Sequence, residues 1–255
     1  MSATPLRLLA AGLLCAACLR PAFADDEKTD KKPNPAAKAS PRRDKWWQDR
    51  HGKFLKQTEK GDIGVVFLGD SITQGWEGSG KEVWKKIFAP LKAGNYGIGG
   101  DQTQHVLWRI TEGKELDGIT PRAAVIMIGT NNMGGHSAEQ IAGGVETIVK
   151  QLRKDKPKMK ILVLGIFPRA GKRIDKSATG AKSGELLEKV NKTNELIKKI
   201  ADDKVVFYKD IGGKFLDKEG GLPKAIMPDY LHLSAKGYQI WADAIKADVE
   251  KMTKE

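Results

Sequence analysis

Cysteine is nearly absent from this sequence, and histidine is scarce. The chain has two cysteines, Cys15 and Cys18, and four histidines scattered between His51 and His232. Both cysteines fall in the first 24 residues, so the rest of the chain can form no disulfide, no cysteine nucleophile and no cysteine-bound zinc site. The histidines form no His-x-x-x-His pair, so we predict no metal site.

The sequence also lacks an apolar run long enough to cross a membrane. The run from Leu8 to Leu19 is shorter than the roughly 20 residues that a spanning helix needs. Arg7 precedes this run, and a small-x-small cleavage site ending at Ala24 follows it, which is the pattern of a secretory signal. We expect cleavage after Ala24 and export to the periplasm or the exterior. A lipid anchor on either cysteine is less favoured, because neither has the Leu-x-(Gly/Ala) context of a lipobox.

Acidic residues are fewer than basic ones. The chain has 32 Asp and Glu against 44 Lys and Arg, and its net charge is +12. Loss of Arg7 and Arg20 with residues 1–24 would lower this charge to +10. The lysines are spread along the chain, which favours a solvated surface over a site for an anionic polymer. No motif indicates a nucleic-acid partner, and the oligomeric state stays open.

Large apolar residues are also missing from the segment that follows the predicted signal. Asp25–Arg43 is charged and contains proline, so we predict a disordered linker there and one domain over residues 44–255. Trp47, Phe54 and Leu55 recur at near-helical spacing and predict a short helix. For the pair Trp46-Trp47 we favour core packing over stacking against a carbohydrate.

Beyond residue 60, predicted strands alternate with predicted helices. Strands are expected at 63–68, 95–98, 123–128, 160–166 and 205–208, and helices at 81–88, 101–112, 137–152, 185–201 and from 234 onward. The helix at 101–112 should be capped by Asp101 with Gln104, and the next helix should open with a Ser137-x-x-Gln140 capping box. The segment Arg169–Ser183 is predicted as a basic loop insertion. Five such units predict an α/β fold, with a five-stranded parallel sheet and helices on both faces.

Polar residues gather at the expected carboxyl edge of this sheet. Ser71 follows the first strand, Gly100 the second and Asn131 the third, while Asp229 and His232 precede the last helix. Ligands bind at this edge in open parallel sheets, so we expect these residues to form one site. Each residue alone also has an ordinary structural explanation, such as a helix cap or a turn.

Together these residues supply the groups that acyl transfer needs. Ser71 is the candidate nucleophile and His232 its base, while Asp229 would hold the second imidazole nitrogen. Candidate donors for the oxyanion are the Ser71 N–H, the Gly100 N–H and the Asn131 side-chain amide.

The same residues carry a family resemblance. Gly69-Asp70-Ser71, Gly100, Asn131 and Asp229-x-x-His232 resemble the four motif blocks of the SGNH (GDSL) hydrolases, in the same order. The sequence is most similar to the branch of platelet-activating-factor acetylhydrolase catalytic subunits. That closer similarity is carried by 95–101, 105–109, 129–132 and 230–234.

This resemblance implies a flavodoxin-like SGNH fold, a Ser71–His232–Asp229 triad and ester hydrolysis without a cofactor. It also implies that Ile72, Thr130 and Leu231 line a small acyl pocket that favours acetyl.

Two features depart from the animal members of that branch, which are cytosolic: the predicted signal and the basic insertion. Acetylated carbohydrate and an acetylated lipid similar to platelet-activating factor are therefore alternative substrates for a secreted esterase. A longer-chain lipase or thioesterase is a second hypothesis. A non-catalytic protein that binds an anionic polymer on the same fold is a third.

Overall fold

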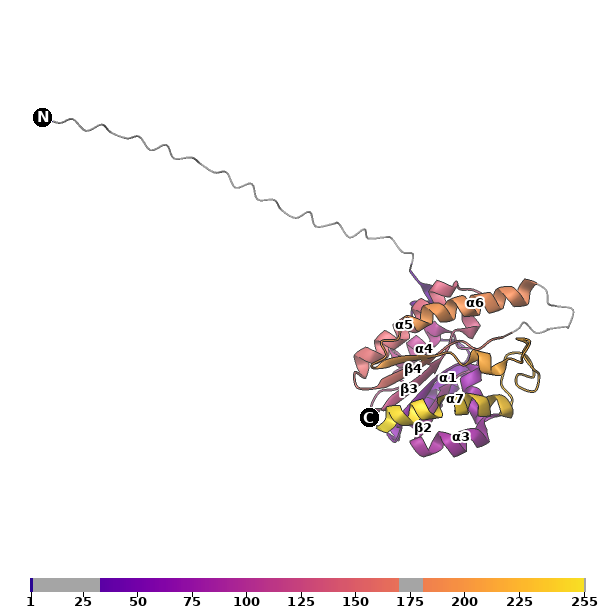
Figure 1. Ribbon diagram of the computed structural model, residues 1–255. Helices are drawn as coiled ribbons and strands as arrows, with labels where there is room; N and C mark the ends of the chain where they lie inside the picture. The colour runs from indigo at the N-terminus through magenta and orange to yellow at the C-terminus, as the bar shows by residue number, and fades with distance from the viewer. Residues whose placement is uncertain (2–32, 170–180, 255) are drawn as a thin grey trace. The chain divides into compact units, whose positions relative to one another are not determined.

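The computed structural model describes residue 1, residues 33–169 and residues 181–254 (Figure 1). The predicted signal and residues 170–180 of the predicted insertion lie outside the described residues. The strands are β1 Val65–Gly69, β2 Ala93–Gly97, β3 Ala123–Met127, β4 Lys160–Leu164 and β5 Val206–Lys209. The α-helices are α1 Lys45–Glu59, α2 Ser71–Gln74, α3 Lys81–Ile87, α4 Thr103–Ile110, α5 Ala138–Asp155, α6 Ala181–Lys198 and α7 Ala235–Lys254. Short 3-10 helices are η1 Pro35–Ala37, η2 Gly75–Glu77, η3 Ala89–Leu91, η4 Thr130–Asn132 and η5 Gly212–Phe215.

The five strands form one parallel sheet in the order β2-β1-β3-β4-β5. Strand β1 lies between β2 and β3, and Val65 pairs with Ala93 on one side and Ala123 on the other. This is a doubly wound order: the chain adds β2 on one side of β1 and then adds β3, β4 and β5 on the other side. The predicted fold class is therefore confirmed, and the loops after β1 and β3 diverge at the point where such folds bind ligands.

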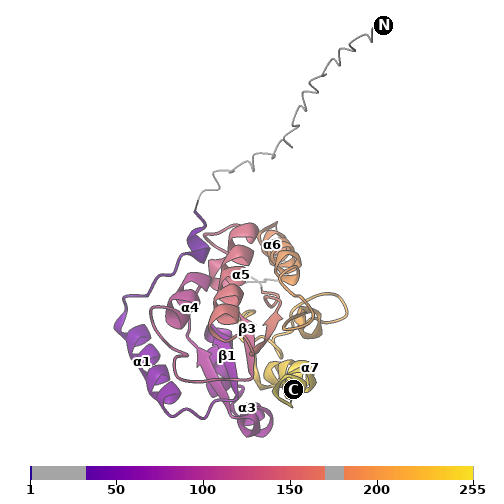
Figure 2. The same ribbon diagram turned by 90° about the vertical axis from the view of Figure 1, so that its left-hand side faces the viewer.

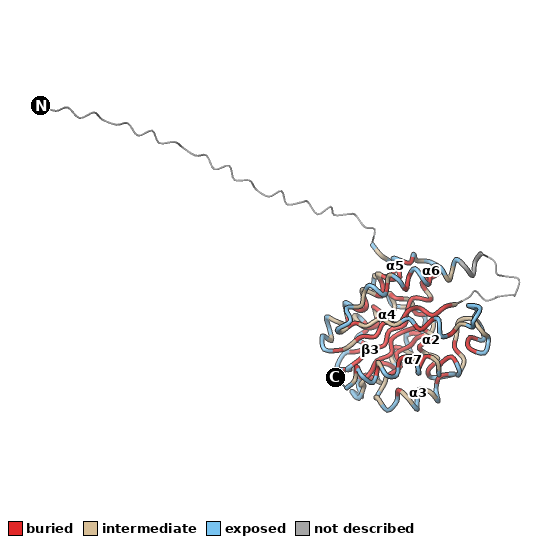
Figure 3. The backbone as a smooth tube through the Cα atoms, viewed as in Figure 1, coloured by how far each residue is buried: buried red, intermediate tan, exposed pale blue. Residues whose placement is uncertain are grey.

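Helices cover both faces of the sheet (Figure 2). Alternate side chains of β1 point to opposite faces, as a strand requires. Val66 and Leu68 join the core under α1, α4, α5 and α6, while Val65 and Phe67 join the core under α3 and α7. Strands β1 and β3 are consequently buried along their whole length, whereas the edge strand β5 is mostly half-buried; buried backbone is red in Figure 3.

Several predicted helix signals are confirmed, and one is wrong. Ser137 and Gln140 form the predicted capping box, with reciprocal bonds of 3.2 Å and 2.8 Å. Helix α4, however, begins at Thr103 rather than at residue 101, and its capping box joins Gln102 to His105.

Tertiary contacts explain the shifted start of α4. The carboxylate of Asp101 is fully buried, accepts a hydrogen bond from the Trp47 indole at 2.7 Å and forms an ion pair with Arg109 at 3.0 Å. It is therefore committed to contacts outside its own helix and cannot serve as the cap.

The other boundaries move by a few residues. Both ends of every strand lie within two residues of the expected positions, and β1, for example, starts at 65 rather than 63. Helix α6 starts at Ala181, so the last three residues of the predicted insertion are helical rather than loop.

The described end of the predicted linker, residues 33–43, is ordered against the domain, which corrects that part of the prediction. Ala36 is fully buried, and its carbonyl accepts a hydrogen bond from the Thr103 hydroxyl at 2.7 Å. The Asn34 side chain donates to the carbonyl of Gln140 at 2.9 Å. Few apolar side chains are needed, because hydrogen bonds attach the backbone of this segment to α4 and its Asn34 side chain to α5.

The two adjacent tryptophans of α1 have different environments. Trp47 is buried and packs in the core as predicted, together with Phe54. Trp46 is 51% exposed, so the expectation of core packing is wrong for this residue.

No helix in residues 33–169 or 181–254 combines the length and the apolar character needed to cross a membrane.

Candidate active site

Ser71 is the first residue of α2, directly after the buried strand β1. Asp70 caps this short helix, because its Oδ1 accepts the N–H of Ile72 at 2.9 Å. The glycine before it, Gly69, pairs with Gly97 of β2 and Met127 of β3. Ser71 is thus presented from the rigid centre of the sheet and keeps a partly exposed side chain.

The three residues predicted as a triad form one chain of hydrogen bonds. The Oγ atom of Ser71 lies 2.9 Å from Nε2 of His232, and Nδ1 of His232 lies 2.6 Å from Oδ2 of Asp229. A carboxylate can only accept, so Nδ1 carries the proton of the neutral imidazole and Nε2 is free to accept from Ser71. This is the tautomer that proton removal from a serine requires.

Asp229 is organised by the turn that it begins. Its Oδ1 accepts the N–H groups of Leu231 at 3.1 Å and His232 at 2.7 Å. Tyr230, which lies between Asp229 and Leu231, has a φ of 59°, a left-handed conformation uncommon for such a side chain. Partial burial raises the pKa of Asp229, but the hydrogen bonds from His232 and Leu231 outweigh this effect and hold the pKa below its usual value. The carboxylate therefore stays charged and holds the imidazole in place.

The triad side chains are open to solvent on one side. The side chain of His232 is 44% exposed and that of Asp229 is 56% exposed. Together with the partly exposed Ser71, these side chains are accessible from solvent.

The loops that carry Gly100 and Asn131 are tied together beside Ser71. The Asn131 amide donates to the carbonyl of Asp101 at 2.9 Å, and Gln102 donates from its side chain to the carbonyl of Asn131 at 2.8 Å. Gly100 has a φ of 79°, which favours glycine at this turn. The Asn131 nitrogen carries a second hydrogen, which a substrate oxygen can accept.

The residues predicted to line the acyl pocket differ in exposure. Ile72 and Thr130 are buried, whereas Leu231 is partly exposed. Arg169 donates to the carbonyl of Thr130 at 2.9 Å and contacts its hydroxyl at 3.2 Å. The sequence placed Arg169 only in a basic loop, since nothing in its neighbourhood signals a contact with a residue 39 positions earlier.

Two further titratable groups next to the site have structural roles. His105 accepts the N–H of Gln102 at 3.0 Å, and burial lowers its pKa to about 4, so it is neutral at physiological pH. Asp70 is fully buried, and its Oδ2 has no hydrogen-bond partner among the described residues. Burial raises the pKa of Asp70 to about 7, although the Ile72 N–H and Arg169 act in the opposite direction.

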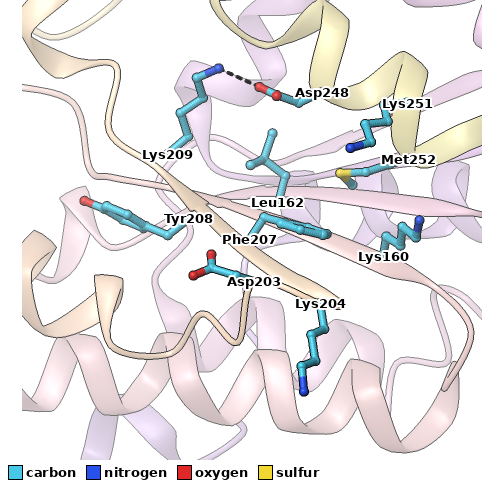
Figure 4. A pocket seen from close by; sticks show the side chains of 10 residues that line it. All are labelled: Lys160, Leu162, Asp203, Lys204, Phe207, Tyr208, Lys209, Asp248, Lys251 and Met252. Atoms are coloured by element: carbon cyan, nitrogen blue, oxygen red, sulfur yellow. Dashed lines mark hydrogen bonds and ion pairs between the residues drawn. The ribbon is translucent and has the colours of Figure 1, made fainter.

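A pocket of about 480 Å³ lies elsewhere, beside β5 and the end of α7 (Figure 4). Four lysines contribute to it, and one of them, Lys209, forms an ion pair with Asp248 at 2.6 Å. None of the predicted site residues lines this pocket. Among residues 33–169 and 181–254, no three His, Cys, Asp or Glu side chains are grouped so that they could hold a metal ion.

Comparison with known proteins identifies the family of the chain. Residues 67–240 match the GDSL-like lipase/acylhydrolase family. The chain is 38% identical over 210 residues to platelet-activating factor acetylhydrolase IB subunit alpha1 from Bos taurus, covering 80% of this chain and 84% of that protein. It is also 38% identical over 196 residues to the alpha2 subunit from Rattus norvegicus, covering 75% of this chain and 78% of that protein.

Solved structures share the fold at lower sequence identity. A GDSL-like lipase from Bacteroides thetaiotaomicron superimposes with a TM-score of 0.63 and 19% identity, over 79% of this chain and 97% of that chain. The acetyl xylan esterase AlAXEase gives a TM-score of 0.55 and 23% identity, over 73% of this chain and 100% of that chain. At these identities the likeness shows the fold alone.

The raised pKa of Asp70 predicts a specific dependence of stability on pH. Between about pH 4 and pH 7 the folded protein holds a proton on Asp70 that the unfolded chain has released, so stability should fall as the pH rises through this interval. Asp70→Asn stays neutral and keeps an oxygen for the Ile72 N–H. From about pH 5 to about pH 8, the wild type should lose on the order of 2–3 kcal/mol of unfolding free energy relative to this variant.

Urea unfolding at a series of pH values measures this difference. Asp117→Asn, at an exposed carboxylate, is the control and should show no such trend. A difference between wild type and Asp70→Asn that does not change with pH would contradict the assignment of the buried proton to Asp70.

Proposed function

This chain belongs to the GDSL-like lipase/acylhydrolase family and is a carboxylic ester hydrolase, and on that premise we propose that it removes acetyl groups with Ser71 as nucleophile. The observation that carries the proposal is the hydrogen-bond chain from Ser71 through His232 to Asp229, with bonds of 2.9 Å and 2.6 Å. The fold supplies the two loops, after β2 and β3, that an oxyanion site needs beside this serine.

In the proposed first half-reaction, Nε2 of His232 takes the hydroxyl proton while Oγ of Ser71 attacks the carbonyl carbon of the ester. Asp229 stabilises the imidazolium that forms. The proton then passes from His232 to the leaving alcohol oxygen as the bond from the acyl carbon to that oxygen breaks. An acetyl-enzyme on Ser71 and a free alcohol result.

In the second half-reaction, water takes the place of the alcohol. His232 removes a proton from the water, whose oxygen attacks the acetyl carbonyl. The bond to Ser71 Oγ breaks, the serine regains its proton from His232, and acetate leaves. No cofactor takes part in the proposed sequence.

Each attack creates a negative oxygen that needs donors already in place. The proposed donors are the Ser71 N–H, the Gly100 N–H and the Asn131 amide. Asn131 is fixed for this role by its bond to the Asp101 carbonyl, so little reorganisation is needed when charge develops. One such donor typically contributes ~3 kcal/mol of transition-state stabilisation.

A short acyl group suits the proposed pocket. Ile72 and Thr130 are already buried against the core, and Arg169 covers Thr130 from the next loop. We therefore propose that the pocket formed by these residues and Leu231 accepts an acetyl group. The names of the relatives that are 38% identical support acetyl as well, since they describe acetylhydrolase subunits. A lipase or thioesterase for longer chains is the alternative within the family.

We further propose that the protein is exported, because residues 1–24 have the pattern of a cleaved secretory signal. The substrate would then be an ester outside the cytoplasm. The two proposed substrate classes are acetylated carbohydrates and acetylated ether lipids.

The catalytic assignment predicts a defined pattern of initial rates on p-nitrophenyl acetate, butyrate and octanoate. Wild-type turnover should fall steeply from acetate to octanoate. Ser71→Ala should lose at least about a thousandfold in kcat, and Asn131→Ala about a hundredfold to a thousandfold.

Ser79→Ala, at an exposed serine, is the matched control and should keep wild-type rates. Retention of more than a few per cent of turnover by Ser71→Ala would exclude it as nucleophile. Faster turnover of octanoate than of acetate would contradict the acetyl pocket and favour a pocket for longer acyl chains. Absence of any hydrolysis would leave the non-catalytic binding protein as the hypothesis to pursue.

Export is tested by expressing the full chain in a Gram-negative host and sequencing the N-terminus of the protein in each fraction. We expect a periplasmic or secreted protein that begins at Asp25. Cytoplasmic protein that retains Met1 would contradict the proposal, and a chain that begins at a lipid-modified Cys18 would favour the membrane-anchored alternative.

A further inference from the structure

Trp46 is the unusual surface residue of this protein. Among the described residues, only Trp46 and the terminal Met1 are large hydrophobic residues that count as exposed, and 51% of Trp46 is accessible to solvent. Its neighbour Trp47 is 1% exposed and packs against His51 and Trp108. A half-exposed indole keeps a flat apolar surface that a ligand can cover.

Trp46 stands next to the proposed nucleophile. A methyl group added at Gly99 would lie 3.6 Å from Cη2 of Trp46 and 3.7 Å from Cβ of Ser71. The indole and the serine therefore flank the same glycine. One sugar residue that carries an acetyl group can reach from one to the other.

The start of α1 and the segment before it are attached to the end of β2 and to the loop that follows it. Arg42 donates to the carbonyl of Gly99 at 2.6 Å, and Arg50 donates to the carbonyl of Gly97 at 2.8 Å. Arg50 is itself fixed by two bonds to Glu77, at 2.8 Å and 3.1 Å. Trp46 lies between Arg42 and Arg50 in the sequence, so these bonds fix the backbone that carries Trp46 against the end of β2 and the loop after it.

We propose that Trp46 is the platform on which a sugar ring stacks while its acetyl ester is cleaved at Ser71. The inference rests on the proposed function and identifies the substrate as an acetylated carbohydrate. The face of a pyranose ring carries C–H groups that pack on an indole, and its hydroxyl groups need polar neighbours. Arg42 and Gln74 provide such neighbours, since Arg42 keeps 24% of its side chain exposed and the Gln74 side chain is part of the same loop contact.

The surroundings of Trp46 favour a sugar over an acylated lipid. An alkyl chain is stabilised by a continuous apolar surface, and a protein that binds a membrane presents several large apolar side chains together. Within the described residues Trp46 has no exposed large apolar neighbour, and two charged side chains, Arg42 and Arg50, bond to the backbone of Gly99 and Gly97 in the same region. A single flat aromatic surface with a polar rim matches one sugar ring.

The test compares two acetyl esters that differ in the alcohol. One is β-D-xylopyranose tetraacetate, and the other is ethyl acetate, whose leaving group has no ring to stack. Acetate release is measured for wild type, Trp46→Ala, Trp46→Tyr and the control Lys53→Ala, which changes another exposed residue of α1. Trp46→Ala should lose roughly tenfold in kcat/KM on the sugar ester, mainly through KM, and stay within about twofold on ethyl acetate. Trp46→Tyr should retain most of the sugar activity, and Lys53→Ala all of it.

Each other outcome has a distinct meaning. If wild type cleaves neither ester, or if Ser71→Ala cleaves them as well as wild type does, the proposed function fails. If wild type cleaves ethyl acetate through Ser71 but Trp46→Ala is unchanged on the sugar ester, only the platform is excluded. Equal losses on both esters would show that Trp46 supports the loop rather than the sugar. A loss confined to an acetylated ether phospholipid, measured in parallel, would assign Trp46 to a lipid substrate and overturn the proposal.

Discussion

The site depends above all on the buried ion pair between Asp101 and Arg109. Both side chains are fully buried and lie 3.0 Å apart. Burial raises the pKa of Asp101 to about 6, although Arg109 and the Trp47 indole favour its charged form. Removal of one partner from such a pair typically costs about 3–5 kcal/mol, because an uncompensated charge stays in the interior. Asp101, the residue after Gly100, therefore anchors the loop that carries Gly100.

Three parts of the chain meet at Asp101. Its carboxylate receives the indole N–H of Trp47 from α1, and its backbone carbonyl receives the amide of Asn131 from the loop after β3. The proposed oxyanion donors and the proposed sugar platform are consequently tied to one residue. The proposed triad is positioned by β1 and by the Asp229–His232 turn. Arg109 connects the two parts of the site, because it also contacts the carbonyl of Gly69 at the end of β1, at 3.3 Å.

Much of the fold and of the geometry of the site followed from local patterns. Continuous apolar runs predicted the strands, and Ser137 with Gln140 predicted the start of α5, because these signals act over a few residues. The prediction that Ser71, Gly100, Asn131 and His232 form one site came from topology, since the carboxyl ends of parallel strands share one edge. The structure shows the bond of Ser71 to His232 and the bond of Asn131 to Asp101, the residue after Gly100.

The features that the sequence did not predict depend on long-range contacts. Asp101 looked like a helix cap, but its partners Trp47 and Arg109 take it out of that role. Residues 33–43 looked like a linker because they are polar, yet they are held by hydrogen bonds to α4 and α5. Neither the contacts of Asp101 nor those of residues 33–43 can be recognised from the neighbouring residues in the sequence. The exposure of Trp46 is similar, because only the placement of α1 decides which tryptophan of the pair faces solvent.

We propose that an acyl group is transferred to Ser71. The most direct measurement is to mix the enzyme with p-nitrophenyl acetate, stop the reaction with acid within the first turnover and map the acetylated peptide by mass spectrometry. The account predicts one acetyl group on the peptide that contains Ser71, which disappears as turnover is completed. An acetyl group on another residue, or p-nitrophenol release with no acetylated Ser71 at any early time, would contradict it.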